Sequence, residues 1–327
     1  MGVDGLSVGF VGLGEVGGKL AGSLAREGFD LTVFDLSPDA VARLAEKGAK
    51  PATSVADIAA GVDVLITCLP SPAASAAVID EAFAAMRPGS LWLEMSTTDA
   101  DEVRRLEAIA AGRGIAVLDC PVSGGCHRAA TGNIAIFAGG DRAAFERALP
   151  LLTAMGADIL HTGPLGSAST LKVMTNYLAT ANLVTLCEAL MVMEKSGQDL
   201  ATTFEAIRIS SGNSFVHETE SQLILNGSRN VGFTMDLVLK DIGLFQKLAD
   251  AAGIGLEVNP LLIDIFRDGK ARYGGGEWST NIVRRIEDAT GTTLHADGFP
   301  EELVDTVPKQ PGHEIPARPA QSKETVS

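Results

Sequence analysis

The sequence has 327 residues, 46% of them hydrophobic, which suffices for roughly two globular domains and excludes a wholly disordered chain. Its 26 Lys and Arg residues face 41 Asp and Glu residues, and the formal net charge of −15 argues against nucleic acid and anionic membranes as partners. Aromatic residues make up only 5% of the chain, which leaves little surface for stacking on bases.

The first half of the chain alternates short apolar runs with helical patterns. Helical patterns cover residues 38–47, 75–86 and 99–111, among others. This alternation predicts an α/β fold over residues 1–164, with a Rossmann-type, doubly wound, mostly parallel sheet that carries helices on both faces. The expected strands are residues 7–11, 31–34, 62–69, 90–95, 115–118, 134–138 and 159–162.

The alternation stops near Gly163, where an all-α C-terminal domain is expected to begin and to cover residues 165–292. Its first helix, at about residues 168–196, contains no Pro or Gly and is strongly apolar. Polar residues interrupt every window of about 20 residues, so we interpret it as a buried helix between domains and not as a membrane span. Shorter helices are predicted at 200–209, 218–225, 235–252 and 259–269. Proline and polar residues predominate in 293–327, which predicts a flexible tail.

The four cysteines, at positions 68, 120, 126 and 187, form no CxxC pair. So few thiols in a chain of this length are typical of a reducing compartment, and we expect neither disulfides nor a bound metal. Residues 1–7 include an acidic residue and no basic stretch, so we expect no signal peptide and a cytoplasmic protein.

A glycine-rich turn follows the first predicted strand and opens a helix. Its three glycines would allow a tight turn, the close approach of a pyrophosphate, and close packing of helix on strand. The helix N-terminus would add N–H groups for the phosphates. Asp35 follows the next strand, where a carboxylate can accept hydrogen bonds from an adenosine ribose and would repel a 2′-phosphate. The sequence therefore predicts an NAD site, favoured over NADP, formed by Asp35 and by Gly12, Leu13, Gly14, Glu15, Val16 and Gly17.

Two further segments carry candidate chemistry. Successive N–H groups of Ser123, Gly124 and Gly125 can form a concave nest that binds a carboxylate. Lys172 and Asn176 are four residues apart in the long helix and project from the same face. A Lys beside an amide donor suits a carbonyl oxygen that gains negative charge during hydride transfer, so Lys172 is the candidate general acid and base.

Four motifs together resemble the β-hydroxyacid dehydrogenase family, and in particular its 3-hydroxyisobutyrate dehydrogenase branch. They are the glycine turn followed by Phe34-Asp35, the run 119–125, Lys172 with Asn176, and Lys240-Asp241. The resemblance extends over residues 7–291. It implies a homodimer or homotetramer that acts on a small carboxylate substrate.

The resemblance also implies roles for individual residues. Lys172 would be catalytic, Asn176 would position the substrate, and the nest of residues 123–125 would bind the substrate carboxylate. Phe233 would be either a wall of the substrate pocket or a core residue. The further cofactor contacts would be Leu69, Pro70, Thr97 and Lys240.

The sequence departs from the family pattern at several positions. Val16 stands where the family usually has Met. Thr175 stands where the family usually has Asn, and the effect of this second change on the substrate is left open. Residues 126–128, Cys-His-Arg, replace a stretch that is usually small and contains glycine. We expect either a solvated loop there or a contact between His127 or Arg128 and a second anionic group of the substrate.

The expected activity is the NAD-dependent oxidation of a small β-hydroxy acid to its semialdehyde, of the 3-hydroxyisobutyrate type, or the reverse reaction. The alternatives are reduction of tartronate or succinate semialdehyde and a non-catalytic dinucleotide-binding protein. Relatives that reduce imines usually replace the catalytic Lys, so Lys172 argues against that activity and against a non-catalytic role.

Overall fold

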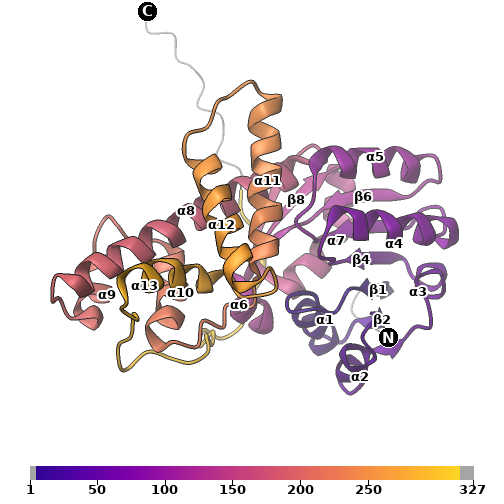
Figure 1. The fold of residues 1–327 in the computed structure, drawn as a ribbon. Coiled ribbons are helices and arrows are strands. Elements are labelled where there is room, and N and C mark those ends of the chain that lie inside the picture. The colour runs from indigo at the N-terminus through magenta and orange to yellow at the C-terminus, as the bar shows by residue number, and fades with distance from the viewer. Residues whose placement is uncertain (1–4, 317–327) are drawn as a thin grey trace, which may run out of the picture.

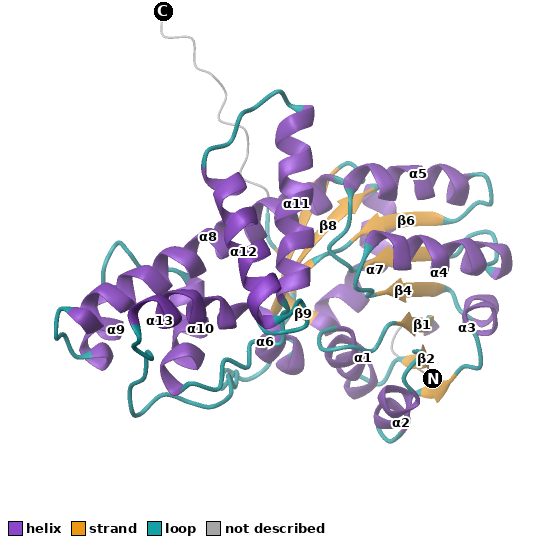
Figure 2. Ribbon diagram, in the orientation of Figure 1, coloured by secondary structure: helices purple, strands orange, loops and turns teal. Residues whose placement is uncertain are grey.

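A mostly parallel sheet forms the centre of the N-terminal half (Figure 2). The computed structural model describes residues 5–316. The expectation of no signal peptide concerns residues 1–4 in part, and these lie outside the described residues. Residues 317–327 of the expected tail also lie outside them. The strand order is β10-β9-β8-β6-β5-β4-β1-β2-β3, and β7 pairs with β8. Only the β6–β8 and β7–β8 pairs are antiparallel among the described strands. The strands are β1 (Ser7–Val11), β2 (Asp30–Phe34), β3 (Lys50–Pro51), β4 (Val64–Thr67), β5 (Leu91–Glu94), β6 (Ala116–Asp119), β7 (Val122–Ser123), β8 (Ile134–Gly140), β9 (Gly156–Gly163) and β10 (His313–Glu314).

Helices cover both faces of this sheet, as the alternating pattern predicts. Successive side chains of a strand point to opposite faces, so Ile66 of β4 joins a core with α1 and α7, whereas Leu65 joins a core with α3, α4 and α5. Trp92 of β5 lies in the second core and its neighbour Leu93 in the first. The helices of this half are α1 (Gly17–Arg26), α2 (Pro38–Ala45), α3 (Val55–Gly61), α4 (Pro72–Ala85), α5 (Ala100–Ala111), α6 (Gly125–Thr131) and α7 (Arg142–Met155).

The C-terminal half is helical and surrounds α8, which packs against β8 of the sheet and against α10, α11 and α12 (Figure 1). The Rossmann-type α/β domain and the helical region after it are therefore confirmed. By length and composition α8 could cross a membrane, but a buried core helix meets the same test, and it does pack on both halves of the protein. The elements are α8 (Ser167–Lys195), α9 (Leu200–Arg208), α10 (Phe215–Asn226), α11 (Met235–Ala251), α12 (Val258–Tyr273), the short 3-10 helix η2 (Ser279–Val283) and α13 (Arg284–Thr290).

The expectation of a flexible tail is wrong for residues 293–316. Leu294 is fully buried, and β10 adds a parallel strand to β9 at the edge of the sheet. Arg142 forms two hydrogen bonds to the carboxylate of Glu314, at 2.6 and 2.9 Å. A segment rich in proline and polar residues can still have a fixed conformation. Here strand pairing and ion pairs with a distant part of the chain supply it.

One buried carboxylate joins the two halves. Asp119, at the end of β6, is 0% exposed. Its Oδ1 accepts a hydrogen bond from the Gly166 N–H at 2.8 Å, and its Oδ2 accepts from the N–H and hydroxyl of Ser169 at 2.6 and 2.8 Å. Gly166 is the N-cap of α8 and has no side chain to satisfy the first N–H groups of this helix. The sheet therefore caps α8 through Asp119, and this fixes the start of the helix that carries Lys172.

We predict that Asp119→Ala lowers the free energy of unfolding by about 3 kcal/mol or more, because it leaves three buried donors without an acceptor. Denaturant unfolding followed by tryptophan fluorescence reports on both halves, since the two tryptophans are Trp92 and Trp278. Lys50→Ala is the control, because it removes only the exposed Lys50–Asp30 ion pair and should cost less than about 1 kcal/mol. Equal unfolding midpoints for the two variants would contradict the structural role of Asp119.

Candidate active site

The glycine turn has the shape that a pyrophosphate requires. A Cβ on Gly12 would lie 2.3 Å from the Cys68 carbonyl oxygen, and a Cβ on Gly17 would lie 2.1 Å from the Gly12 carbonyl oxygen. Gly12 also has φ +95°, so both positions need glycine for the fold itself. A Cβ on Gly14 would meet no described atom within 4 Å, so the backbone here faces open space. No side chain caps the first turn of α1, whose N–H groups can bind phosphate. The turn therefore fits a dinucleotide.

The other residues of this turn, Leu13, Glu15 and Val16, lie in different surroundings. Glu15 is exposed and pairs with Lys19 at 3.3 Å, while Leu13 is buried. Val16 is the N-cap residue of α1 and has no side-chain donor or acceptor. The cofactor contacts predicted for these three residues would be made through their backbone.

Asp35 lies directly after β2, beside the glycine turn. Its Oδ2 accepts a hydrogen bond from the Leu13 N–H at 2.6 Å, and its Oδ1 accepts from the Ser37 N–H at 2.7 Å. Each oxygen keeps a further lone pair that can accept from a ribose hydroxyl. The neighbouring Leu36 is 92% exposed and offers no charge to a 2′-phosphate. The arrangement fits the adenosine ribose of NAD.

The turns after β4 and β5 are connected to each other and to the helical half. The Leu69 N–H donates to Ser96 Oγ at 2.8 Å, and the Ser96 N–H donates to the carboxylate of Glu94 at 2.8 Å. Lys240, on α11, donates from Nζ to the Thr97 carbonyl oxygen at 2.6 Å. The structure thus brings Leu69, Thr97 and Lys240 together, with exposed Pro70 next to Leu69. Glu94, which was not among the predicted site residues, is 1% exposed, and in the sequence it stands out only as an acid in an apolar strand.

Lys172 and Asn176 lie in a buried polar cluster with Asp241. Asn176 Nδ2 donates to Asp241 Oδ2 at 2.5 Å, and Lys240 Nζ is 2.8 Å from Asp241 Oδ1. Lys172 is 8% exposed and has no ion-pair partner within 4.0 Å in residues 5–316. Burial, assisted by the charge of Lys240 and opposed by Asp241, lowers the pKa of Lys172 from 10.5 to about 8. A lysine with this pKa can exchange a proton near neutral pH.

Asp241 is a site residue to which the sequence analysis gave no role of its own. It is 1% exposed and is the acceptor that holds the amide of Asn176. The available signal was its position beside Lys240 in α11, which by itself is also typical of an ordinary ion pair on a helix surface.

The carboxylate nest has backbone angles that only glycine adopts readily. Gly124 has φ +130° and Gly125 has φ +81°, directly after Ser123 at the end of β7. A loop from the helical half approaches this nest, because a Cβ on Gly232 would lie 3.0 Å from Cys126 Sγ and 4.0 Å from Glu15 Oε2. The nest, the glycine turn and the loop before α11 therefore border a common region.

Phe233 follows Gly232 in this loop. Its side chain is partly buried and packs against the helical core, and its carbonyl oxygen accepts from the Ser279 N–H at 2.7 Å. The structure thus places Phe233 at the edge of that core, one residue from the position that approaches the nest.

Residues 126–128 do not form a solvated loop, because they lie in helix α6. The ring of His127 stacks on Phe215 of α10, with centroids 6.2 Å apart, and the guanidinium carbon of Arg128 lies 4.7 Å from the centre of the same ring. Burial and the neighbouring Arg128 lower the pKa of His127. The stretch that departs from the family pattern therefore makes an interdomain contact.

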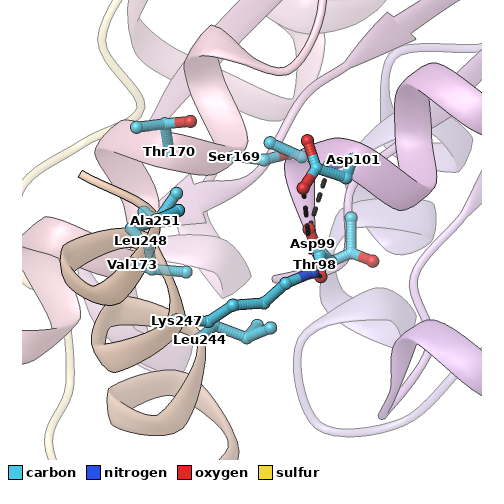
Figure 3. Close-up of a pocket in the computed structure, with 11 residues that line it drawn as sticks. Thr98, Asp99, Asp101, Ser169, Thr170, Val173, Leu244, Lys247, Leu248 and Ala251 are labelled. Atoms are coloured by element: carbon cyan, nitrogen blue, oxygen red, sulfur yellow. Dashed lines mark hydrogen bonds and ion pairs between the residues drawn. The ribbon is translucent and has the colours of Figure 1, made fainter. Parts of the chain in front are cut away.

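A small crevice lies between the start of α5 and helices α8 and α11 (Figure 3). Its volume of about 30 Å³ accommodates about one water molecule. Lys247 reaches across it to Asp99 at 2.5 Å and Asp101 at 3.7 Å. None of the predicted site residues lines this crevice, so it is an interdomain seam and not the substrate site.

Comparison with known protein families identifies both halves of the chain. Residues 7–163 match the model described as the NAD binding domain of 6-phosphogluconate dehydrogenase. Residues 166–286 match the model described as NAD-binding of NADP-dependent 3-hydroxyisobutyrate dehydrogenase. The chain therefore has NAD-binding domains in both halves, as the glycine turn predicted for the first.

Individual relatives cover most of the chain. It is 31% identical to 2-(hydroxymethyl)glutarate dehydrogenase of Eubacterium barkeri, over 88% of this chain and 97% of the relative. It is 35% identical to NAD-dependent L-serine dehydrogenase of Pseudomonas aeruginosa, over 86% of this chain and 98% of the relative. The crystal structure of 3-hydroxyisobutyrate dehydrogenase from Salmonella typhimurium aligns with a TM-score of 0.80 and 29% identity, over 86% of this chain and 99% of the other. The chain belongs to the β-hydroxyacid dehydrogenase family of oxidoreductases.

We predict that substitution of Gly14 affects cofactor binding, whereas substitution of Gly17 affects folding. Gly14→Ala should melt like the unmodified protein but bind NAD about tenfold or more weakly, because its methyl group occupies the space of the pyrophosphate. Gly17→Ala should melt at a lower temperature, because its Cβ cannot coexist with the Gly12 carbonyl oxygen. Thermal denaturation and NAD titration measure the two effects. Unchanged NAD affinity in Gly14→Ala would show that the phosphates bind elsewhere.

Proposed function

We propose that this protein catalyses the NAD-dependent oxidation of a small β-hydroxy acid to its semialdehyde, or the reverse reduction. The observation that carries the proposal is the buried Lys172 with its lowered pKa, next to the Asn176–Asp241 pair and Lys240. These groups lie where the helical half meets the carboxyl ends of the parallel strands. Ligands of open α/β sheets bind at that edge.

Each proposed role follows from the chemistry of the group. Bound NAD would accept a hydride from the hydroxyl-bearing carbon of the substrate. Neutral Lys172 would take the hydroxyl proton during oxidation, and its ammonium form would return a proton during reduction. Asn176, held by Asp241, would donate a hydrogen bond to the same oxygen. Backbone N–H groups of residues 123–125 would hold the carboxylate and thereby orient the substrate.

The relatives suggest the substrate class. L-Serine, 3-hydroxyisobutyrate and 2-(hydroxymethyl)glutarate, which appear in their names, share a hydroxymethyl group on the carbon that bears the carboxylate. We propose a substrate of this kind, with 3-hydroxyisobutyrate as the first candidate. Reduction of tartronate or succinate semialdehyde is the alternative.

Asp35 supports NAD as the preferred nucleotide. Its carboxylate would repel a 2′-phosphate, and the exposed Leu36 beside it provides no compensating charge. Side-by-side titration with NAD and NADP measures this preference, and tighter binding of NADP would refute it.

We predict that substitutions of Lys172 and Asn176 on α8 lower the turnover rate to different extents. Lys172→Ala should lower the rate by ~10²–10⁴-fold while NAD affinity and folding change little, because the side chain acts on the substrate oxygen. Asn176→Ala should lower the rate less than Lys172→Ala does, because it removes a neutral hydrogen bond and leaves the proton donor in place. Lys172→Arg should not restore activity, since a guanidinium keeps its proton. Steady-state rates on the best substrate test this order, and a tenth of the normal rate in Lys172→Ala would contradict the assignment.

The pH dependence follows from the pKa of about 8. Oxidation needs neutral Lys172, so its kcat/KM should rise as the pH increases through about 8, and reduction should fall over the same range. Asp241 raises the pKa of Lys172, so Asp241→Asn should move the inflection to lower pH. Rate profiles between pH 6 and 10, roughly two units on either side, measure both effects. A flat oxidation profile would show that another group transfers the proton.

A further inference from the structure

The C-terminal segment 293–316 extends beyond the part of the chain that the family models match, which ends at residue 286. It begins on the helical half. The Ala296 N–H donates to the Leu225 carbonyl oxygen at 2.9 Å, and Asn226 Nδ2 donates to the Phe299 carbonyl oxygen at 2.9 Å. The ring of Phe299 also packs edge-on against Phe204, with centroids 5.1 Å apart. The first part of the segment is therefore anchored on α9 and α10.

The segment then crosses to the N-terminal half and contacts the end of α6. Asp305 Oδ2 accepts hydrogen bonds from Thr131 Oγ1 at 2.5 Å and from Asn133 Nδ2 at 2.8 Å. Asn133 is held further by the Val307 carbonyl oxygen at 3.0 Å and by the Gln310 N–H at 2.8 Å. The segment ends on the sheet edge, where β10 pairs with β9. It thus forms a strap between the two halves.

Helix α6 is short and is held mainly through its surface. Arg26 of α1 donates to the carbonyl oxygens of Ala130 and Thr131 at 3.3 and 3.2 Å, and His127 and Arg128 pack on Phe215. The helix has seven residues, only Ala129 is buried, and no side chain caps its N-terminus. It begins at Gly125, the last residue of the carboxylate nest, and ends at Thr131, which binds Asp305. A displacement of its C-terminal end would therefore be transmitted to the nest over less than two turns.

The carboxylate of Asp305 suits this position. Although burial opposes ionisation, hydrogen bonds from Thr131, Asn133 and Val307 and the nearby His127 leave the pKa of Asp305 lowered overall. It is thus charged at neutral pH, and charge-assisted hydrogen bonds are stronger than neutral ones.

We propose that the strap, residues 293–316, uses Asp305 to position α6 and thereby the backbone N–H groups of residues 123–125 that receive the substrate carboxylate. Asp305 is in this account a positioning residue, and the strap contributes to substrate affinity from outside the matched family region. The inference rests on the proposed role of the nest.

The test compares Asp305→Ala with Glu314→Ala in the full chain. Asp305→Ala should raise KM for the best hydroxy acid by about five- to twentyfold, while kcat and NAD affinity change less than about twofold. Asp305→Asn should recover part of the affinity, because its amide oxygen can still accept from Thr131 and Asn133. Glu314→Ala loses only the exposed pair with Arg142 at the far end of the strap, so KM should remain normal.

Hydrogen exchange of residues 122–134 provides a readout that needs no substrate. Asp305→Ala should accelerate exchange there and leave the exchange of α3 unchanged, whereas Glu314→Ala should accelerate neither. Normal exchange and normal KM in Asp305→Ala would overturn the proposal, as would equal effects of both variants. Failure of the unmodified protein to oxidise any hydroxy acid would refute the proposed function. The exchange result alone would then test whether Asp305 positions α6.

Discussion

The hydrogen bonds of Asp119 to the start of α8 are the interaction on which the site depends. The sheet supplies the dinucleotide turn and the carboxylate nest, whereas α8 and α11 supply the lysines and the amide. Both the nest and the cap of α8 come from one short stretch, since Asp119 precedes Ser123 by only four residues. A shift of α8 along its axis would therefore move Lys172 relative to the nest. Capping by a fully buried carboxylate makes that shift costly.

Two lysines lie at the junction of the two halves, although the protein as a whole is acidic. The chain carries a formal net charge of −15, which would repel an anionic substrate at long range. At the junction, Lys240 pairs with the buried carboxylate of Asp241, whose charge also acts on Lys172. Burial strengthens such interactions because the surroundings are less polar than water. Burial is also the main cause of the lowered pKa of Lys172, so the same location that strengthens binding of an anion prepares the proton carrier.

Local patterns predicted the elements, the glycine turn with Asp35, the nest and Lys172 with Asn176. The family resemblance added Leu69, Pro70, Thr97, Phe233 and Lys240. Short apolar runs predicted the strands and the helical spacing of apolar residues predicted the helices, because both patterns reflect local packing. The expectation failed where partners are distant in sequence. Asn176 and Asp241 are 65 residues apart, and Asp305 binds Thr131 across 174 residues, which no spacing rule anticipates. No bounds were predicted for helix α7, which contains Pro150, a residue that usually ends a helix.

The most direct test of the account compares a β-hydroxy acid with its own methyl ester as substrates of the unmodified protein with NAD. The account requires the carboxylate charge, because the backbone N–H groups of residues 123–125 and the nearby lysines are there to bind it. Loss of that charge should lower kcat/KM by roughly 30- to 1,000-fold, equivalent to about 2–4 kcal/mol. Equal kcat/KM for acid and ester would contradict the account, because the substrate would then be oriented by other groups.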